Sequence, residues 1–150
     1  ALVGQSLGAG RMRLARSFGR ITLSMGVAIM TLMAVVMYVF SPALMSVMSP
    51  DVSVCCLTVD ILRIEALAEP MFAASIICYG IFVGAGDTTV PCTMNLASIW
   101  GVRIVLAALL SGSYGLQGVW IAMAVELTFR GVIFLIRFHS DRWMKGKKIV

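Results

Sequence analysis

Long runs of apolar residues alternate with short polar segments along this chain. A helix crosses the hydrocarbon layer of a bilayer with about 20 apolar residues, at a rise of about 1.5 Å per residue. Blocks of that length cover residues 21–40, 60–83, 90–110 and 116–138. Prolines and glycines mark the segments between them. The pattern predicts an all-α fold, a polytopic membrane helix bundle of about four transmembrane helices.

Composition strengthens this prediction. The chain is 60% hydrophobic and 13% charged, whereas soluble domains are roughly 45–50% apolar and about 25% charged. The chain opens on Ala1, inside an apolar, Gly-rich run. We therefore expect it to be the C-terminal piece of a longer membrane protein, and we do not expect it to act alone.

The net charge of +5 is concentrated at two places. Arg11, Arg13, Arg16 and Arg20 precede the first block, and Arg142, Lys145, Lys147 and Lys148 lie in the tail 139–150. The segments 41–56 and 111–115 contain no Lys or Arg. Because cytoplasmic loops are rich in Lys and Arg, we expect both clusters, including the basic tail, on the cytoplasmic side of the plasma (inner) membrane. Charges that flank spans in this way do not indicate a nucleic-acid partner.

Carboxylates inside the second block are the first candidate site. Glu65 and Glu69 are four residues apart and share one helix face. A buried carboxylate is unfavourable unless it is paired or hydrated, so this pair could exchange a proton or hold Na⁺. Pro70 disrupts the helical hydrogen bond to the carbonyl of Ala66 and frees an oxygen nearby. We predict that Glu69, Glu65 and Asp60 couple a cation; pairing with Arg63 is the alternative for Asp60.

A second candidate group lies in the last two blocks. Glu126 and Arg130 are four residues apart in the order that favours a helical ion pair. Asn95 and Ser98 are polar neighbours on the preceding block. Two interpretations stay open for Asn95, Glu126 and Arg130: a self-neutralised structural pair, or a gate or substrate-cavity contact.

Complete catalytic and metal motifs are not found in the sequence. The four cysteines show no C-x-x-C spacing and have no nearby histidine, which argues against a metal site. There is no H-E-x-x-H and no G-x-S-x-G paired with an intramembrane His. We therefore expect no enzyme activity and no cofactor other than a coupling cation, H⁺ or Na⁺.

Four stretches carry a resemblance to a known family. They are "LVGQSLGAGR" (2–11), "LRIEALAEPMFAASIICYGIFVGAGDTTVP" (62–91), "NLASIWGVRIVLA" (95–107) and "GLQGVWIAMAVELTFRGVIFLIRF" (115–138). In their order and spacing, they resemble the C-terminal part of multidrug and toxic compound extrusion (MATE) transporters, close to the NorM-like group. The resemblance covers nearly the whole chain.

The resemblance implies a twelve-helix transporter of two lobes around a central cavity. Residues 1–10 would end a preceding helix, and the four spans would belong to the C-terminal lobe. The implied function is an antiporter that exports organic, often cationic, drug-like compounds in exchange for H⁺ or Na⁺. Its partners would be the lipid bilayer, such substrates and the missing N-terminal lobe. A lipid-linked precursor flippase of the same superfamily is the alternative, and a membrane-embedded enzyme is a more remote one.

Overall fold

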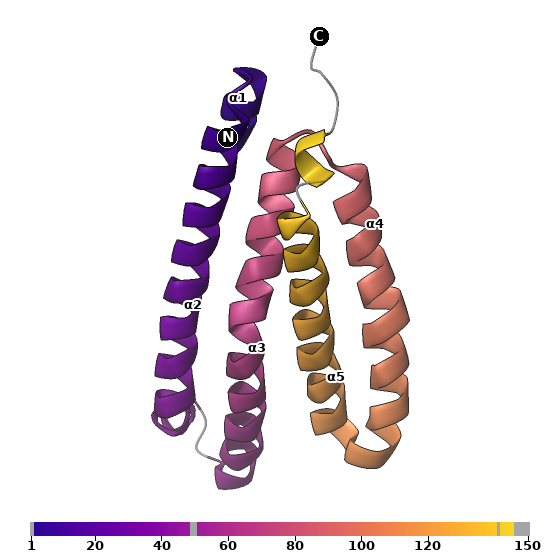
Figure 1. Cartoon of the computed structure of the whole chain (residues 1–150). Coiled ribbons are helices and arrows are strands. Elements are labelled where there is room, and N and C mark those ends of the chain that lie inside the picture. The colour runs from indigo at the N-terminus through magenta and orange to yellow at the C-terminus, as the bar shows by residue number, and fades with distance from the viewer. Residues whose placement is uncertain (1, 49–50, 141, 146–150) are drawn as a thin grey trace.

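The computed structural model describes residues 2–48, 51–140 and 142–145, and all of its regular elements are helices. In chain order they are α1 (Leu2–Gly8), α2 (Met12–Met48), α3 (Val52–Gly84), α4 (Thr89–Ser98), the π-helical η1 (Ile99–Ile104), α5 (Val105–His139) and the 3₁₀ helix η2 (Arg142–Lys145). The long elements lie side by side as an antiparallel bundle (Figure 1). The structure confirms the predicted all-α membrane helix bundle.

Among the residues that the structure describes, three continuous helical stretches are long and apolar enough to cross a membrane: Met12–Met48, Ser53–Gly84 and Thr89–His139. The helices extend beyond the apolar blocks. In particular, α2 continues through Pro42 to Met48. Asp51 then caps α3, where its side chain accepts a hydrogen bond from the Ser53 amide at 2.9 Å. This cap satisfies one of the free amides at the start of the helix.

The third stretch reverses direction at one residue. Its 51 residues would extend about 75 Å if straight, far more than a bilayer requires. Gly115 has φ 56° and ψ −132°, outside the helical region and accessible mainly to glycine. Beyond it, a Cβ added to Gly118 would lie 2.3 Å from the Leu110 carbonyl oxygen. Two closely packed antiparallel arms result, residues 89–114 and 116–139 (Figure 1).

Aromatic residues form the core at the end of the bundle where α2 begins and α5 ends. Phe82 stacks on Phe134 with ring centroids 5.9 Å apart, and Phe138 stacks on Trp143 at 5.7 Å. The Trp143 indole also donates a hydrogen bond to the Phe138 carbonyl at 3.1 Å. The same cluster contains Val3, Ala15, Cys78, Ile81 and Ala85. It joins α1, α2, α3, α5 and η2.

The described parts of both basic segments lie at this aromatic end, whereas Lys147 and Lys148 lie outside the described residues. The start of α2 carries Arg13, Arg16 and Arg20, and η2 lies near it at the same end of the bundle (Figure 1). The opposite end contains the α2–α3 connection and the reversal at Gly115. The positive-inside rule led us to expect both basic segments on one side of the membrane, and this arrangement is compatible with that expectation.

Candidate functional site

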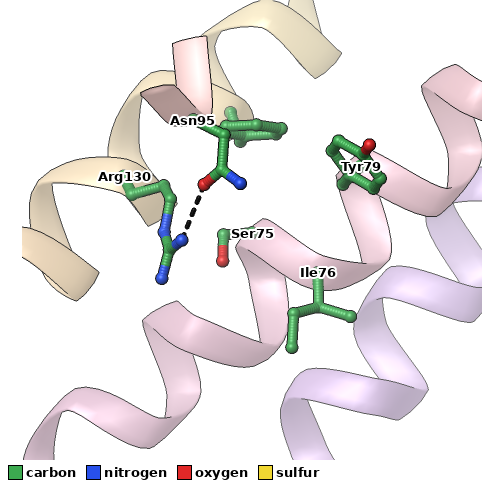
Figure 2. A pocket seen from close by; sticks show the side chains of 6 residues that line it. Ser75, Ile76, Tyr79, Asn95 and Arg130 are labelled. Atoms are coloured by element: carbon green, nitrogen blue, oxygen red, sulfur yellow. Dashed lines mark hydrogen bonds between the residues drawn. The ribbon is translucent and has the colours of Figure 1, made fainter. Parts of the chain in front are cut away.

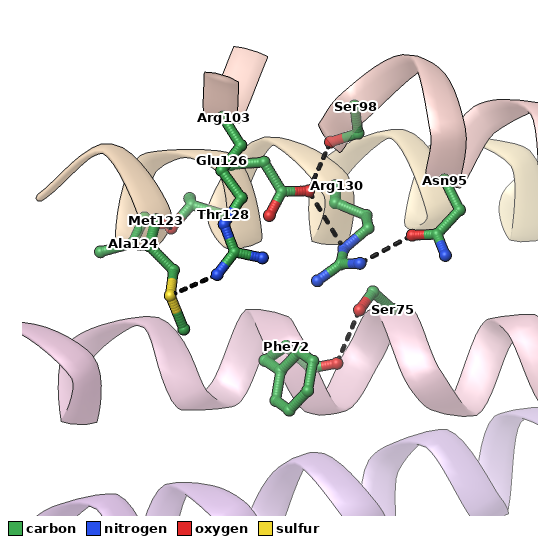
Figure 3. A network of polar contacts seen from close by, with 10 residues as sticks. All are labelled: Phe72, Ser75, Asn95, Ser98, Arg103, Met123, Ala124, Glu126, Thr128 and Arg130. Carbon is green, nitrogen blue, oxygen red and sulfur yellow. Dashed lines mark hydrogen bonds and ion pairs between the residues drawn. The ribbon is translucent and has the colours of Figure 1, made fainter. Parts of the chain in front are cut away.

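A buried polar network joins α4 to α5 in the middle of the bundle. Glu126 is fully buried, and its Oε1 accepts a hydrogen bond from Ser98 Oγ at 2.7 Å. Arg130 Nε lies 3.3 Å from the same oxygen, which confirms the predicted helical ion pair. Arg130 Nη1 donates to Asn95 Oδ1 at 2.7 Å (Figure 3). Glu126 lies about 20 Å along the axis from His139, so the network is deep in the span.

The same arginine ties this network to α3. Its guanidinium lies over the Phe72 ring, 5.7 Å from the centroid, a cation–π contact. The side chain of Arg130 is only 12% exposed. Within the described residues, Glu126 Oε2 is buried without a hydrogen-bond partner. The network thus contains one charge pair and one carboxylate oxygen that can still accept a hydrogen bond.

A cavity of about 140 Å³ lies beside the network, between α3, α4 and α5. Its lining residues are Ser75, Ile76, Tyr79, Asn95, Arg130 and Phe134 (Figure 2). Because Asn95 Oδ1 accepts from Arg130, the amide nitrogen is the group directed toward Ser75 and Tyr79. Ser75 Oγ donates to the Phe72 carbonyl at 2.7 Å, so its oxygen keeps acceptor capacity. The cavity combines polar groups at one side with aromatic walls.

Two of the three predicted coupling carboxylates, Glu65 and Glu69, lie half-buried on α3. Glu65 interacts electrostatically with Glu69 one turn away and with Arg103 on η1. Glu65 Oε2 is buried and has no hydrogen-bond partner among the described residues. Glu69 lies about 22 Å along the axis from Gly84, near the middle of α3. Glu65 and Glu69 therefore lie one turn apart near mid-depth, and the charge of Arg103 on η1 acts on Glu65.

The other predicted features lie apart from this group. Asp60 is exposed, and Arg63 lies over the Tyr38 ring at 5.3 Å from the centroid. Pro70 and Ala66 line a different cavity of about 280 Å³, between α2 and α3. Ala66 and Pro70 thus line the α2 side of α3, whereas η1, which carries Arg103, packs on α5.

Sequence reasoning did not include Arg103, Phe72, Ser75 or Tyr79 in the site. Residues 65, 69, 72, 76 and 79 recur at helical spacing, which is the signal that could have shown that they follow one face of α3. Arg103 also contacts Met123 Sδ, so it lies inside the bundle (Figure 3). Among the described residues, no group of three or more His, Cys, Asp and Glu side chains could hold a metal ion.

Long apolar helices with ionisable groups at mid-depth define a multi-pass membrane protein. The family model described as MatE matches residues 1–109. The chain belongs to the MatE family.

Curated relatives agree with this family. The chain is 29% identical over 144 residues to a "Probable multidrug resistance protein NorM" of Brucella suis, which covers 91% of this chain and 31% of that protein. A protein with the same name from Deinococcus radiodurans is 29% identical over 143 residues, with 91% and 32% covered. The "Uncharacterized transporter YisQ" of Bacillus subtilis is 26% identical over 124 residues, with 81% and 27% covered. The chain therefore spans about a third or less of the length of these relatives.

Proposed function

We propose that the protein containing this chain is a secondary active efflux transporter. It exports organic, often cationic compounds in exchange for H⁺ or Na⁺. The observation that carries this proposal is the group formed by Glu65, Glu69 and Arg103 at mid-depth, with a buried Glu65 oxygen that has no hydrogen-bond partner among the described residues. Buried ionisable groups of this kind mark ion and substrate pathways in membrane proteins. The names of the relatives point to drug resistance.

Charge balance suggests how these residues couple a cation to movement. Without a bound cation, the Glu65 and Glu69 carboxylates repel each other and attract Arg103. Uptake of H⁺ or Na⁺ by the pair weakens the attraction between these carboxylates on α3 and Arg103 on η1. Because the cation stabilises one arrangement more than the other, it shifts the equilibrium between inward- and outward-facing states. A cationic substrate competes for the same negative charge.

The flippase alternative is favoured by one observation, the two arginines inside the bundle. Cationic side chains are what a pyrophosphate-linked lipid would require. However, Arg130 is paired with Glu126 and Arg103 lies near Glu65, so carboxylates offset both charges. We therefore prefer export of organic compounds. We further propose that both basic ends face the cytoplasm, that residues 139–150 form a cytoplasmic tail in the plasma (inner) membrane, and that a preceding lobe completes the path.

Ethidium efflux from cells that express the intact gene product tests the proposal. We expect Glu69→Gln and Glu65→Gln to reduce cation-driven efflux at least tenfold, because a neutral amide cannot exchange the coupling cation. Asp51→Asn is the matched control, since this carboxylate is exposed at the cap of α3. If cells that express the wild-type protein retain ethidium but release labelled lipid-linked precursor, the protein is the flippase instead.

A further inference from the structure

A groove lined by residues of α2, α3 and α5 lies on the outside of the bundle, away from the polar network. Its volume is about 350 Å³, which is within the range of about 300–1,000 Å³ typical of ligand sites. Helix α2 contributes Arg20 and Val27, α3 contributes Met71, and α5 contributes His139. Among the described residues that line the groove, none is Asp or Glu. The groove therefore has a positive charge and no negative one.

Two glycines of α2 set the packing that forms the groove. A Cβ added to Gly19 would lie 3.1 Å from Phe138 Cε2, and one added to Gly26 would collide with the Ile77 side chain. These glycines are seven residues apart and share one helix face, on which α2 approaches α3 and α5 closely. The groove-lining positions of α2 follow one flank of this face at helical spacing. The groove thus runs along a close helix contact.

The groove changes from polar to apolar with depth. Arg20 and His139 line it on the two helices that begin and end at the aromatic end of the bundle (Figure 1). Val27 is seven residues further along α2, about 10 Å deeper. Met71 lies about 20 Å along the axis of α3 from Gly84, which is at the aromatic end. A molecule that fits this groove needs an anionic group at one end and an apolar chain at the other.

The polar end offers hydrogen-bond donors that the described protein does not use. Arg20 is exposed and forms no ion pair with any carboxylate among the described residues. His139 Nδ1 lies 3.1 Å from the Leu135 carbonyl oxygen. Because a carbonyl oxygen only accepts, Nδ1 carries the proton of this contact and Nε2 stays available. Nε2 can accept from a hydroxyl when the ring is neutral and donate to a phosphate oxygen when it is protonated.

We propose that this groove binds one anionic phospholipid from the leaflet at the aromatic end of the bundle. Arg20 and His139 contact the headgroup, and one acyl chain lies along Leu23, Val27 and Met71. Basic pockets between transmembrane helices on the cytoplasmic side hold lipid headgroups in this way, because that leaflet is anionic. The apolar depth of the groove favours a lipid over a soluble phosphate. Cation-coupled transport is not needed for this binding.

Two lipids that differ in headgroup charge test the inference. The purified intact gene product is mixed in detergent with equal amounts of dioleoylphosphatidylglycerol and dioleoylphosphatidylcholine, and bound lipids are counted by native mass spectrometry. For the first bound lipid, we expect a Kd about tenfold lower for the anionic lipid, as a charge-assisted contact supplies. Arg20→Gln should bring the two Kd values within twofold of each other, whereas Arg20→Lys should keep most of the preference.

The matched control for charge is Arg13→Gln. It removes the same charge at the same end of α2, but Arg13 is exposed and does not line the groove. The preference for the anionic lipid should therefore persist in this variant. Unchanged binding of phosphatidylcholine to Arg20→Gln would show that the variant is folded.

A second pair of variants tests the position of the acyl chain. Ser24→Trp fills the groove and should raise the Kd for phosphatidylglycerol at least tenfold, whereas Met25→Trp places the same ring on an exposed neighbour outside the groove and should leave it unchanged. Glycerol 3-phosphate carries a phosphate without acyl chains. It should not displace the bound lipid at equal concentration.

Three results would overturn the inference. If Arg13→Gln and Arg20→Gln lower the preference equally, the anionic lipid responds to overall charge and not to the groove. If Ser24→Trp and Met25→Trp have the same effect, the lipid binds elsewhere. If glycerol 3-phosphate displaces the lipid, the site belongs to a soluble phosphate. The proposed transport function is tested separately by ethidium efflux, so it can stand or fall independently of these results.

Discussion

Arg137 and Asp87 join the last helix to the α3–α4 turn by an ion pair, although 50 residues separate them. The pair is partly shielded from water, with side chains 18% and 15% exposed. The Arg137 guanidinium also lies over the Phe82 ring, 5.6 Å from its centroid. This contact fixes the turn against α5 at the aromatic end of the bundle.

Loss of this contact should destabilise the protein measurably. We expect Arg137→Gln to reduce the free energy of unfolding by about 1–2 kcal/mol, since it removes a charged hydrogen bond and a cation–π contact. SDS titration of the purified protein measures this change, with Arg13→Gln as an exposed control. The double variant with Asp87→Asn should lose little more than either single variant. Additive losses would show that the two residues do not interact.

Trp143 should control access to Cys78. Trp143 is 1% exposed and Cys78 is 0% exposed, and both belong to the aromatic core. Replacing a buried Trp with Ala typically costs about 3–5 kcal/mol because a cavity remains. In a background of Cys55→Ser, Cys56→Ser and Cys92→Ser, we expect Trp143→Ala to accelerate maleimide labelling of Cys78 at least tenfold.

The matched control for that labelling is Trp100→Ala. Trp100 is 68% exposed and does not belong to the aromatic core. Its removal should leave the labelling rate within twofold of the parent. If both variants accelerate the labelling of Cys78 equally, general loosening of the bundle exposes the thiol, and Trp143 of η2 does not specifically cover it.

Gly131 allows α3 and α5 to approach next to the polar network. A Cβ at this position would lie 2.6 Å from the Met71 carbonyl oxygen and 2.9 Å from the Met71 Cβ. Gly131→Ala therefore has to separate the helices, and we expect a loss of about 1–3 kcal/mol in SDS titration, as for other overpacked sites. Gly80→Ala is the control, because nothing lies within 4 Å of an added Cβ there. A Gly80→Ala protein that is equally destabilised would exclude packing as the cause.

Local sequence spacing predicted the features that depend on one helix. Apolar runs of membrane length indicated the bundle, and the four-residue spacing of Glu126 and Arg130 indicated their ion pair, which the structure confirms. Contacts between segments could not be predicted in this way. The interaction of Phe72 with Arg130 and that of Arg103 with Glu65 depend on how α3 packs against the arms 89–114 and 116–139. The hydrophobic periodicity of one helix does not specify how that helix is rotated against its neighbours.

Irregularities of the backbone could not be predicted from the sequence either. The prediction of a loop at 111–115 used the length of the apolar blocks, whereas the structure reverses the chain at Gly115 alone. The π-helical segment η1 contains no proline or charge pattern that would mark it. It nevertheless carries Arg103, whose charge acts on Glu65, and π-helical turns often occur at functional sites.

A variant cycle at Glu126 and Arg130 separates the two interpretations of this pair. Glu126→Gln alone leaves the Arg130 charge uncompensated in the bundle, so we expect a loss of about 3–5 kcal/mol in SDS titration. The double variant Glu126→Leu with Arg130→Met removes both charges at similar volume and should recover most of this stability. Buried ion pairs commonly behave in this way, because desolvation offsets their attraction.

Transport by the stable double variant then decides the role of the pair. If it merely holds α4 and α5 together, the double variant should export ethidium at the wild-type rate. If the pair forms a gate or a substrate-cavity contact, we expect ethidium export to fall at least tenfold although the protein stays folded. A double variant that folds and exports ethidium normally would limit the pair to a structural role, since no charge or donor would remain at position 130 to contact substrate.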